Sequence, residues 1–191
     1  KDISSELESI FKKRKIEIKT NTMVEKLETL KTKVKVHLKG GEIIEAEKVL
    51  VAIGVQGNTE NLGLEDVGIE FDKNTINVNE YMQTNIKHIY AIGDIAGPPW
   101  LAHVASAEGM VAADHLCGNS SNHMDYDNIP GCTYCHPEVA SVGLTEEAAI
   151  EKGYNIKIGK FPFNALGKAL ATGDTEGFVK VIFDTKYGEL L

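Results

Sequence analysis

Residues 84–94 read TNIKHIYAIGD, and this stretch predicts both a fold and a chemistry. Residues 88–92 form a short apolar run with β-branched and aromatic members, which is typical of a buried strand. Ligand crevices in α/β folds lie at the carboxyl ends of such strands, where Gly93 and Asp94 follow. Gly93 allows a ligand to approach the backbone closely, and the Asp94 carboxylate can accept hydrogen bonds from a sugar-like diol. We therefore expect an α/β fold with a cofactor crevice beside Asp94.

A helix is expected after this stretch, from about Leu101 to Leu116. Its N-terminus has orphan amide groups and a partial positive charge, which suit an anion or an electron-rich ring edge. The alternative is an ordinary strand and helix unit in which Asp94 is only a loop residue. The helix is rich in small side chains that permit close packing: Ala102, Ala105, Ser106, Ala107, Gly109, Ala112 and Ala113.

Hydrophobic periodicity predicts the other elements. An N-terminal amphipathic helix is expected, with Ser5 and Glu8 as a capping box. The remaining expectations, in chain order, are a strand over 16–18, a hairpin of 34–38 with 43–44, a continuous apolar strand over 48–53, a small hairpin of 69–71 with 76–78, a polar boundary over 118–128, and a helix over 145–152. Leu190 and Leu191 are expected to begin a further strand, so the chain is interpreted as a fragment.

Several spaced motifs then agree with one family. Residues 84–94, followed by Pro99-Trp100-Leu101-Ala102-His103 and Glu108-Gly109, resemble the second flavin-binding segment of the pyridine nucleotide-disulfide oxidoreductases. Within that family, Leu-Ala-His before the helix favours the dihydrolipoamide dehydrogenases over glutathione or mercuric reductases. Further matching segments are residues 49–54, Asn58, residues 62–65, Tyr134, residues 137–146, residues 161–163, Ala165, Ala169 and residues 177–180.

The resemblance implies a fold and a domain division. It places the C-terminal part of an NAD-binding α/β domain at 1–57, a central and second FAD-binding segment at 58–128, and the truncated start of an α+β dimerisation domain at 129–191. The implied cofactors are FAD and NAD. The cofactor-binding residues carried over are Gly54, Gly93, Asp94, Leu101, Ala102 and His103. Asp94 is expected to accept from a flavin ribityl hydroxyl, and His103 to have a packing or hydrogen-bonding role.

The resemblance also implies an activity for the full-length protein. The family's reaction is oxidation of protein-bound dihydrolipoamide with NAD+ through FAD and a redox disulfide. The implied partners are a second copy in a homodimer and the lipoyl-bearing subunits of 2-oxoacid dehydrogenase complexes. The alternatives are another disulfide or mercuric reductase of the same superfamily, or a non-catalytic interaction module. The expected location is the cytoplasm of a bacterium or the mitochondrial matrix of a eukaryote.

The chain departs from the family pattern in two ways. Val55, Gly57 and Lys168 replace residues common in the family, which indicates minor variation within the family pattern. The sequence also contains no Gly-x-Gly-x-x-Gly, no pair of cysteines separated by four residues and no His-Pro-x-x-x-Glu. Because those segments carry catalysis in the family, we assign no catalytic residue here. The chain alone is expected to have no turnover and no stable FAD.

Composition excludes some classes of partner. The chain of 191 residues has a formal charge of −8 with acids and bases interspersed, so no basic face is available for nucleic acid. No apolar stretch reaches the length of a membrane span. We therefore expect neither a nucleic acid nor a membrane as a partner.

The three cysteines permit several interpretations. Cys132, Cys135 and His136 match the C-x-x-C-H haem pattern, but alternating strand sequence follows them. Zinc binding with His115 and Cys117 has possible spacing but irregular ligands. A thioredoxin-like role requires a helix N-terminus beside the pair, which strand sequence does not provide. Reduced thiols without a metal are the simpler expectation.

Overall fold

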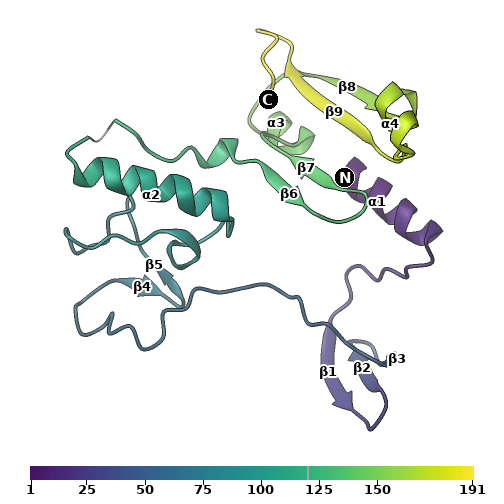
Figure 1. Cartoon of the computed structure of the whole chain (residues 1–191), viewed down its shortest axis with the longest axis horizontal. Helices are drawn as coiled ribbons and strands as arrows, with labels where there is room; N and C mark the ends of the chain where they lie inside the picture. The colour runs from purple at the N-terminus through teal and green to yellow at the C-terminus, as the bar shows by residue number, and fades with distance from the viewer. Residues whose placement is uncertain (120) are drawn as a thin grey trace. The chain divides into compact units, whose positions relative to one another are not determined.

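The computed structural model describes residues 1–119 and 121–191; Ser120, in the polar segment expected to mark a boundary, lies outside the described residues. Two compact units are present, residues 1–52 with 130–191, and residues 53–129. Each unit combines helices with small antiparallel sheets (Figure 1). The mixed helix and strand class expected from the sequence is confirmed.

The N-terminal part of the first unit is a helix followed by a three-stranded sheet. Helix α1 spans Asp2–Lys13, and strands β1 (Val24–Thr29), β2 (Val34–Leu38) and β3 (Ile43–Ala46) pair in that order. Val36 lies opposite Ile44, which fixes the register of the β2–β3 hairpin. The expected hairpin is therefore confirmed.

The C-terminal part of this unit contains two strand pairs. Strands β6 (Gly131–Thr133) and β7 (Val139–Ser141) form one pair, and β8 (Ile156–Pro162) and β9 (Phe178–Asp184) form the other. The elements between them are α3 (Glu146–Glu151), the short 3-10 helix η3 (Phe163–Ala165) and α4 (Gly167–Thr172). The expected helix is confirmed as α3, whose N-cap Thr145 accepts a hydrogen bond from the Ala148 amide.

Ion pairs join α1 to the C-terminal part of its unit. Lys180, whose side chain is only 15% exposed, pairs with Asp2 at 3.1 Å and with Glu146. At the other end of the helix, Arg14 Nη2 lies 2.5 Å from Glu176 Oε2. Because Lys180 is mostly buried, its two carboxylate partners offset the cost of removing its charge from water.

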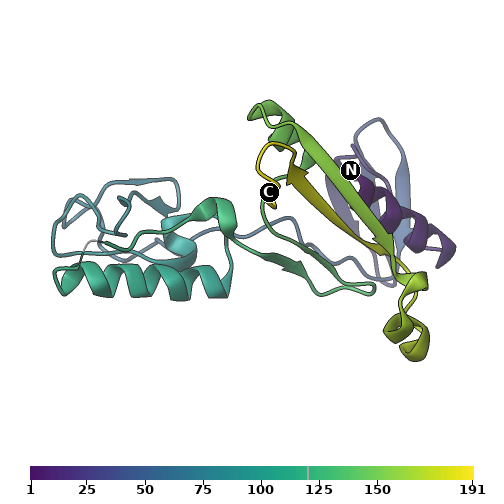
Figure 2. The ribbon, with the colours of Figure 1, turned by 90° about the horizontal axis from the view of Figure 1, so that it is seen from above.

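The second unit surrounds a small apolar core. It contains β4 (Phe71–Asp72), β5 (Thr75–Ile76), the 3-10 helices η1 (Gly93–Ala96) and η2 (Tyr126–Asn128), and helix α2 (Ala102–Leu116). The strands β4 and β5 confirm the expected small hairpin, and α2 confirms the expected helix. In Figures 1 and 2 the helix α2 runs alongside the segment that connects β5 to it. The core cluster consists of Leu64, Ile69, Ile76 and Ala91, with Phe71, Val78, Ile86, Ile89 and Ile95 packed against it.

Two strands expected from apolar runs do not form. In 88–92 only Tyr90 makes a bridge, to Gln83, and 48–53 has no strand; Leu50 is 89% exposed and Ile53 95%. A buried strand needs hydrogen-bonded neighbours on both sides. Among the described residues, 88–92 has a partner on one side only, where the Thr84 amide donates to Ile89 O and the Ala91 amide to Met82 O, and no partner lies alongside 48–53. Apolar content alone was therefore not enough to predict a paired strand.

Two N-terminal expectations are also wrong. Helix α1 begins at Asp2 with Lys1 as N-cap, and Ser5 donates its amide to Lys1 O, so Ser5 and Glu8 are no capping box. Glu8 instead pairs with Lys12 one turn along the helix, at 2.6 Å. Residues 16–18 form no strand, and the first strand of the sheet, β1, begins only at Val24.

A helix that crosses a membrane must be both long and apolar. Among the described residues, none of the helices combines these two properties.

Gly57 provides a test of packing in the second unit. A Cβ at this position would lie 2.2 Å from Asn74 O and 3.1 Å from Ile95 Cα, both backbone atoms. Gly57→Ala should therefore lower the free energy of unfolding of the 53–129 unit by about 1–3 kcal/mol. Urea unfolding followed by fluorescence of Trp100, the single tryptophan, measures this unit.

Gly109→Ala is the matched control in the same unit. Its Cβ would meet only the Cδ1 of Ile92, at 3.3 Å, and Ile92 is 41% exposed and can move. Alanine also favours the helix, so this variant should stay within about 1 kcal/mol of the wild type. Equal losses for the two variants would contradict the backbone clash at Gly57.

Candidate functional site

The turn formed by residues 92–94 lies directly on one face of α2. A Cβ on Gly93 would be 3.3 Å from Ala105 Cβ, and a Cβ on Gly109 would be 3.3 Å from Ile92 Cδ1. Ala105 and Gly109 are four residues apart and share a helix face. Their small side chains allow the turn to approach the helix, which is the close packing that the composition of this helix indicated.

Gly93 and Asp94 begin the short helix η1. Gly93 has φ +72°, which is the left-handed region where a Cβ is unfavourable, and Asp94 is the next residue. The Asp94 side chain is exposed, whereas its backbone is packed, because Gly57 lies close to the Asp94 carbonyl. The structure thus holds the backbone at this position and leaves the carboxylate accessible.

The N-terminus of α2 follows this turn in the chain. Val104 and Ala105 donate their amides to Leu101 O, so the ladder of helical hydrogen bonds begins after Ala102 and His103. Ala102 and His103 are exposed. The Leu101 amide donates to Pro99 O at 2.9 Å. The first two amides of α2, at its positive end, are those of Ala102 and His103.

A hydrogen-bonded loop precedes the turn. Thr84 is buried, its amide donates to Ile89 O at 3.0 Å, and its Oγ1 accepts from the Ile86 amide at 3.1 Å. Ala91 then donates to Met82 O. These bonds close residues 84–89 into a loop. They also fix the direction in which the chain enters Gly93.

A buried carboxylate connects α2 to the turn. Glu108 is 2% exposed, and its Oε2 accepts from the Gly93 amide at 2.6 Å. Its Oε1 accepts from the hydroxyl of Tyr126 at 2.8 Å. Partial burial of the phenol, together with the hydrogen bond and the charge of Glu108, raises the pKa of Tyr126 to about 12.

The sequence-derived residues occupy different environments. Gly93 and Asp94 lie in a turn packed on α2, and Leu101, Ala102 and His103 begin that helix. Gly54 is exposed, and a Cβ placed on it would meet nothing within 4 Å. Gly54 thus has open space where a side chain would stand, and its cofactor-binding role stays a prediction.

Two residues at the turn were not assigned a role from sequence. Glu108 lies on the buried face of α2 with Val104, Val111 and Ala112. A glutamate at an apolar position of the helical pattern could therefore have identified this residue from the sequence. Gly57 gave no comparable signal, because its close neighbours come from residues 74 and 94–95.

The cysteines and histidines favour none of the metal alternatives. Cys117, Cys132 and Cys135 are free, and Cys135 Sγ donates to Pro137 O at 3.0 Å. His115, the candidate zinc ligand, stacks on Tyr81 at 4.5 Å and pairs through Nδ1 with the Tyr90 hydroxyl at 2.7 Å. Across the described residues, no group of three His, Cys, Asp or Glu side chains could hold a metal ion.

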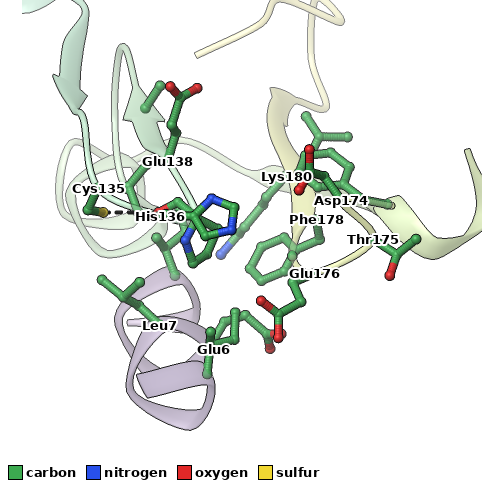
Figure 3. Close-up of a pocket in the computed structure, with 18 of the residues that line it drawn as sticks. Glu6, Leu7, Cys135, His136, Glu138, Asp174, Thr175, Glu176, Phe178 and Lys180 are labelled. Carbon is green, nitrogen blue, oxygen red and sulfur yellow. Dashed lines mark hydrogen bonds between the residues drawn. The ribbon is translucent and has the colours of Figure 1, made fainter. Parts of the chain in front are cut away.

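The first unit contains a half-open cavity of about 1030 Å³ (Figure 3). Helix α1 forms one wall through Glu6 and Leu7, and the loop after β6 and strand β9 form the others. Two cations of its lining are paired: Arg14 donates to His136 O at 2.6 Å and binds Glu176, while Lys180 is held by Asp2 and Glu146. These pairs join the walls to one another.

Two family models match the chain. The pyridine nucleotide-disulphide oxidoreductase model matches residues 1–109, and the dimerisation domain of the same family matches residues 129–191. The dihydrolipoyl dehydrogenase of Zymomonas mobilis is 46% identical over 195 residues, covering 100% of this chain. That of Rhizobium etli is 47% identical over 186 residues, covering 95%. The chain spans 42% and 39% of the length of these relatives.

Solved structures show the same fold. The HOCl-induced flavoprotein disulfide reductase RclA from Escherichia coli aligns with a TM-score of 0.90 at 27% identity, covering 100% of this chain and 44% of that one. LpdA from Mycobacterium tuberculosis aligns with a TM-score of 0.88 at 27% identity, covering 97% and 40%.

Tyr126 offers a pH test of the buried carboxylate. A phenol whose pKa is raised from 10 to about 12 stabilises the fold fully below pH 10, and that contribution is lost as the pH rises through 12. Glu108→Gln removes the charge and should shift this titration toward 10. The ultraviolet absorbance of tyrosinate, with circular dichroism as a check of folding, measures the shift among the six tyrosines.

Tyr126→Phe assigns the late titration to this residue. The variant should lose the step near pH 12 and keep the other five tyrosines unchanged. A late step that persists in Tyr126→Phe would show that it belongs to another group, and an unshifted late step in Glu108→Gln would show that the Glu108 carboxylate does not act on Tyr126.

Proposed function

The chain belongs to the pyridine nucleotide-disulphide oxidoreductase family, and from this premise we propose that it is part of a flavin- and NAD-dependent dihydrolipoyl dehydrogenase. The observation that carries the proposal is the 46–47% identity to dihydrolipoyl dehydrogenases along 95–100% of the chain. The two family matches in chain order support the same assignment.

The proposed reaction of the whole protein is a two-electron oxidation. A protein-bound dihydrolipoyl dithiol becomes a disulfide, and NAD+ accepts two electrons and one proton as the second proton is released. FAD, when bound, supplies the redox chemistry that connects an enzyme disulfide to the nicotinamide. The residues of this chain contribute binding and electrostatics.

The groups around the 92–94 turn fit one side of a flavin. An exposed carboxylate follows a glycine of positive φ, and it precedes a helix N-terminus in the same unit. A carboxylate accepts from hydroxyl donors, and helix-terminal amides favour negative charge. Asp94 would hold a ribityl hydroxyl, and the amides of Ala102 and His103 would favour negative charge on the pyrimidine side. Leu101 would contribute its side chain, because its amide already binds Pro99 O.

The proposed domain division keeps three parts. Residues 1–57 form the C-terminal part of an NAD-binding domain that includes Gly54, residues 58–128 the second FAD segment, and residues 129–191 the start of the dimerisation domain. The compact unit at 53–129 and the separate family match at 129–191 support these boundaries.

The proposed partners follow from the same family. The match to a dimerisation domain over residues 129–191 supports a homodimer. Lipoyl-bearing subunits of a 2-oxoacid dehydrogenase complex would provide the dithiol. A bacterial cytoplasm is the proposed location, with the mitochondrial matrix for a eukaryotic source, and the similarity to bacterial enzymes supports the former.

The full-length protein tests the function. It should purify with bound flavin, seen by its visible absorbance, and reduce NAD+ when dihydrolipoamide is supplied. Bound flavin with reduction of a different disulfide would favour another disulfide reductase, such as RclA, whose structure aligns with this chain. Absence of flavin would contradict the enzyme assignment, and turnover by this chain alone would contradict its predicted inactivity.

Asp94→Ala tests the site within that protein. Loss of a charged hydrogen-bond acceptor should raise the dissociation constant of flavin roughly tenfold or more. Flavin content after gel filtration, and fluorescence titration of the apoprotein, measure the change. Asp66→Ala, at another exposed aspartate of the same unit, is the control and should leave flavin binding unchanged. Equal retention by both variants would reject the role of Asp94.

A further inference from the structure

Glu108 is a buried ionisable group with no role in the function proposed above. It is 2% exposed and shares its helix face with Val104, Val111 and Ala112. A carboxylate in such surroundings is unfavourable unless hydrogen bonds satisfy its oxygens. Helix packing alone would favour an apolar side chain at this position, so packing does not account for the carboxylate of Glu108.

Both oxygens of Glu108 accept hydrogen bonds from neutral donors. Oε2 accepts from the Gly93 amide at 2.6 Å, and Oε1 accepts from the Tyr126 hydroxyl at 2.8 Å. The first bond is the shorter, and a charged acceptor strengthens such bonds. Tyr126 is a neutral donor at ordinary pH, because even an unperturbed phenol has a pKa of about 10.

The bond to Gly93 acts at the point where the chain turns. Gly93 has φ +72° and begins η1, and the next residue is Asp94. Ala105 and Gly109, which flank Glu108 on the same face, let residues 92–93 rest on the helix. Small side chains allow this approach, but the carboxylate of Glu108 binds the amide and so fixes the orientation of that peptide.

We propose that Glu108 is a positioning residue that sets the direction in which Asp94 presents its carboxylate to the flavin. The assignment rests on the proposed function for the ligand. The interaction itself rests on the two hydrogen bonds and the burial of Glu108. Without an acceptor at residue 108, the Gly93 amide is unpaired against the helix, and the peptide that leads into Asp94 can rotate.

Two substitutions of similar length separate hydrogen bonding from packing. Glu108→Gln keeps an oxygen to accept from Gly93 and an amide to donate to Tyr126, so flavin binding should stay within about threefold of wild type. Glu108→Met fills the space without a comparable acceptor and should raise the flavin dissociation constant about tenfold or more. Both are measured on the full-length protein by fluorescence titration of the apoprotein with FAD.

Val111→Ala controls for a general loss of stability. Val111 is buried on the same helix, 7% exposed, and its truncation removes packing but no acceptor. It should lower the melting temperature and leave flavin affinity within about threefold. If Glu108→Met does not fold, Glu108→Ala is compared with Val111→Ala under the same conditions.

Hydrogen exchange gives a readout that needs no flavin. Mass spectrometry of the full-length apoprotein should show faster exchange in peptides containing Gly93 for Glu108→Met, and near wild-type exchange for Glu108→Gln and Val111→Ala. Wild-type flavin affinity in Glu108→Met, a Gln variant as defective as Met, or an equal defect in Val111→Ala would each overturn the positioning role. Wild-type protein without flavin would overturn the proposed function and this assignment with it, whereas the other outcomes leave the function intact.

Discussion

The close approach between the 92–94 turn and helix α2 is the constraint on which the second unit depends. Ala105 and Gly109 leave space for Gly93 and Ile92, and Glu108 between them binds the Gly93 amide at 2.6 Å. Space and hydrogen bonding act together, because a larger side chain would separate the surfaces and a missing acceptor would leave a polar group unpaired. The position of Asp94 follows from both.

The chain at Asp94 and Ile95 is held by a second close approach. Gly57 approaches backbone atoms of Asn74 and Ile95, with no room for a Cβ. The turn is thus packed on a helix and the residues after it on backbone, while the Asp94 side chain stays exposed. A rigid backbone with an accessible side chain is the arrangement that a binding residue requires, because little order has to be gained when a ligand binds.

The first unit is organised by charge as well as by apolar packing. Lys180 is mostly buried between Asp2 and Glu146, and Arg14 reaches both Glu176 and the His136 carbonyl. These contacts join the first residues of the chain to residues more than a hundred positions away. Charged residues near both ends of α1 therefore make tertiary contacts in the fold.

The sequence by itself determined the features that depend on local interactions and on family pattern. The sequence predicted helix α2, the β2–β3 hairpin, α3 and the place of Gly93 and Asp94 just before α2. These features were predictable because helical periodicity, turn residues and capping act within a few positions. Only the tertiary structure decided that residues 48–53 and 88–92 form no paired strands, since strand pairing depends on partners distant in the chain. It also decided the roles of Gly57 and Glu108, because what a glycine must avoid, or a buried carboxylate must bind, is set by residues that only folding brings near.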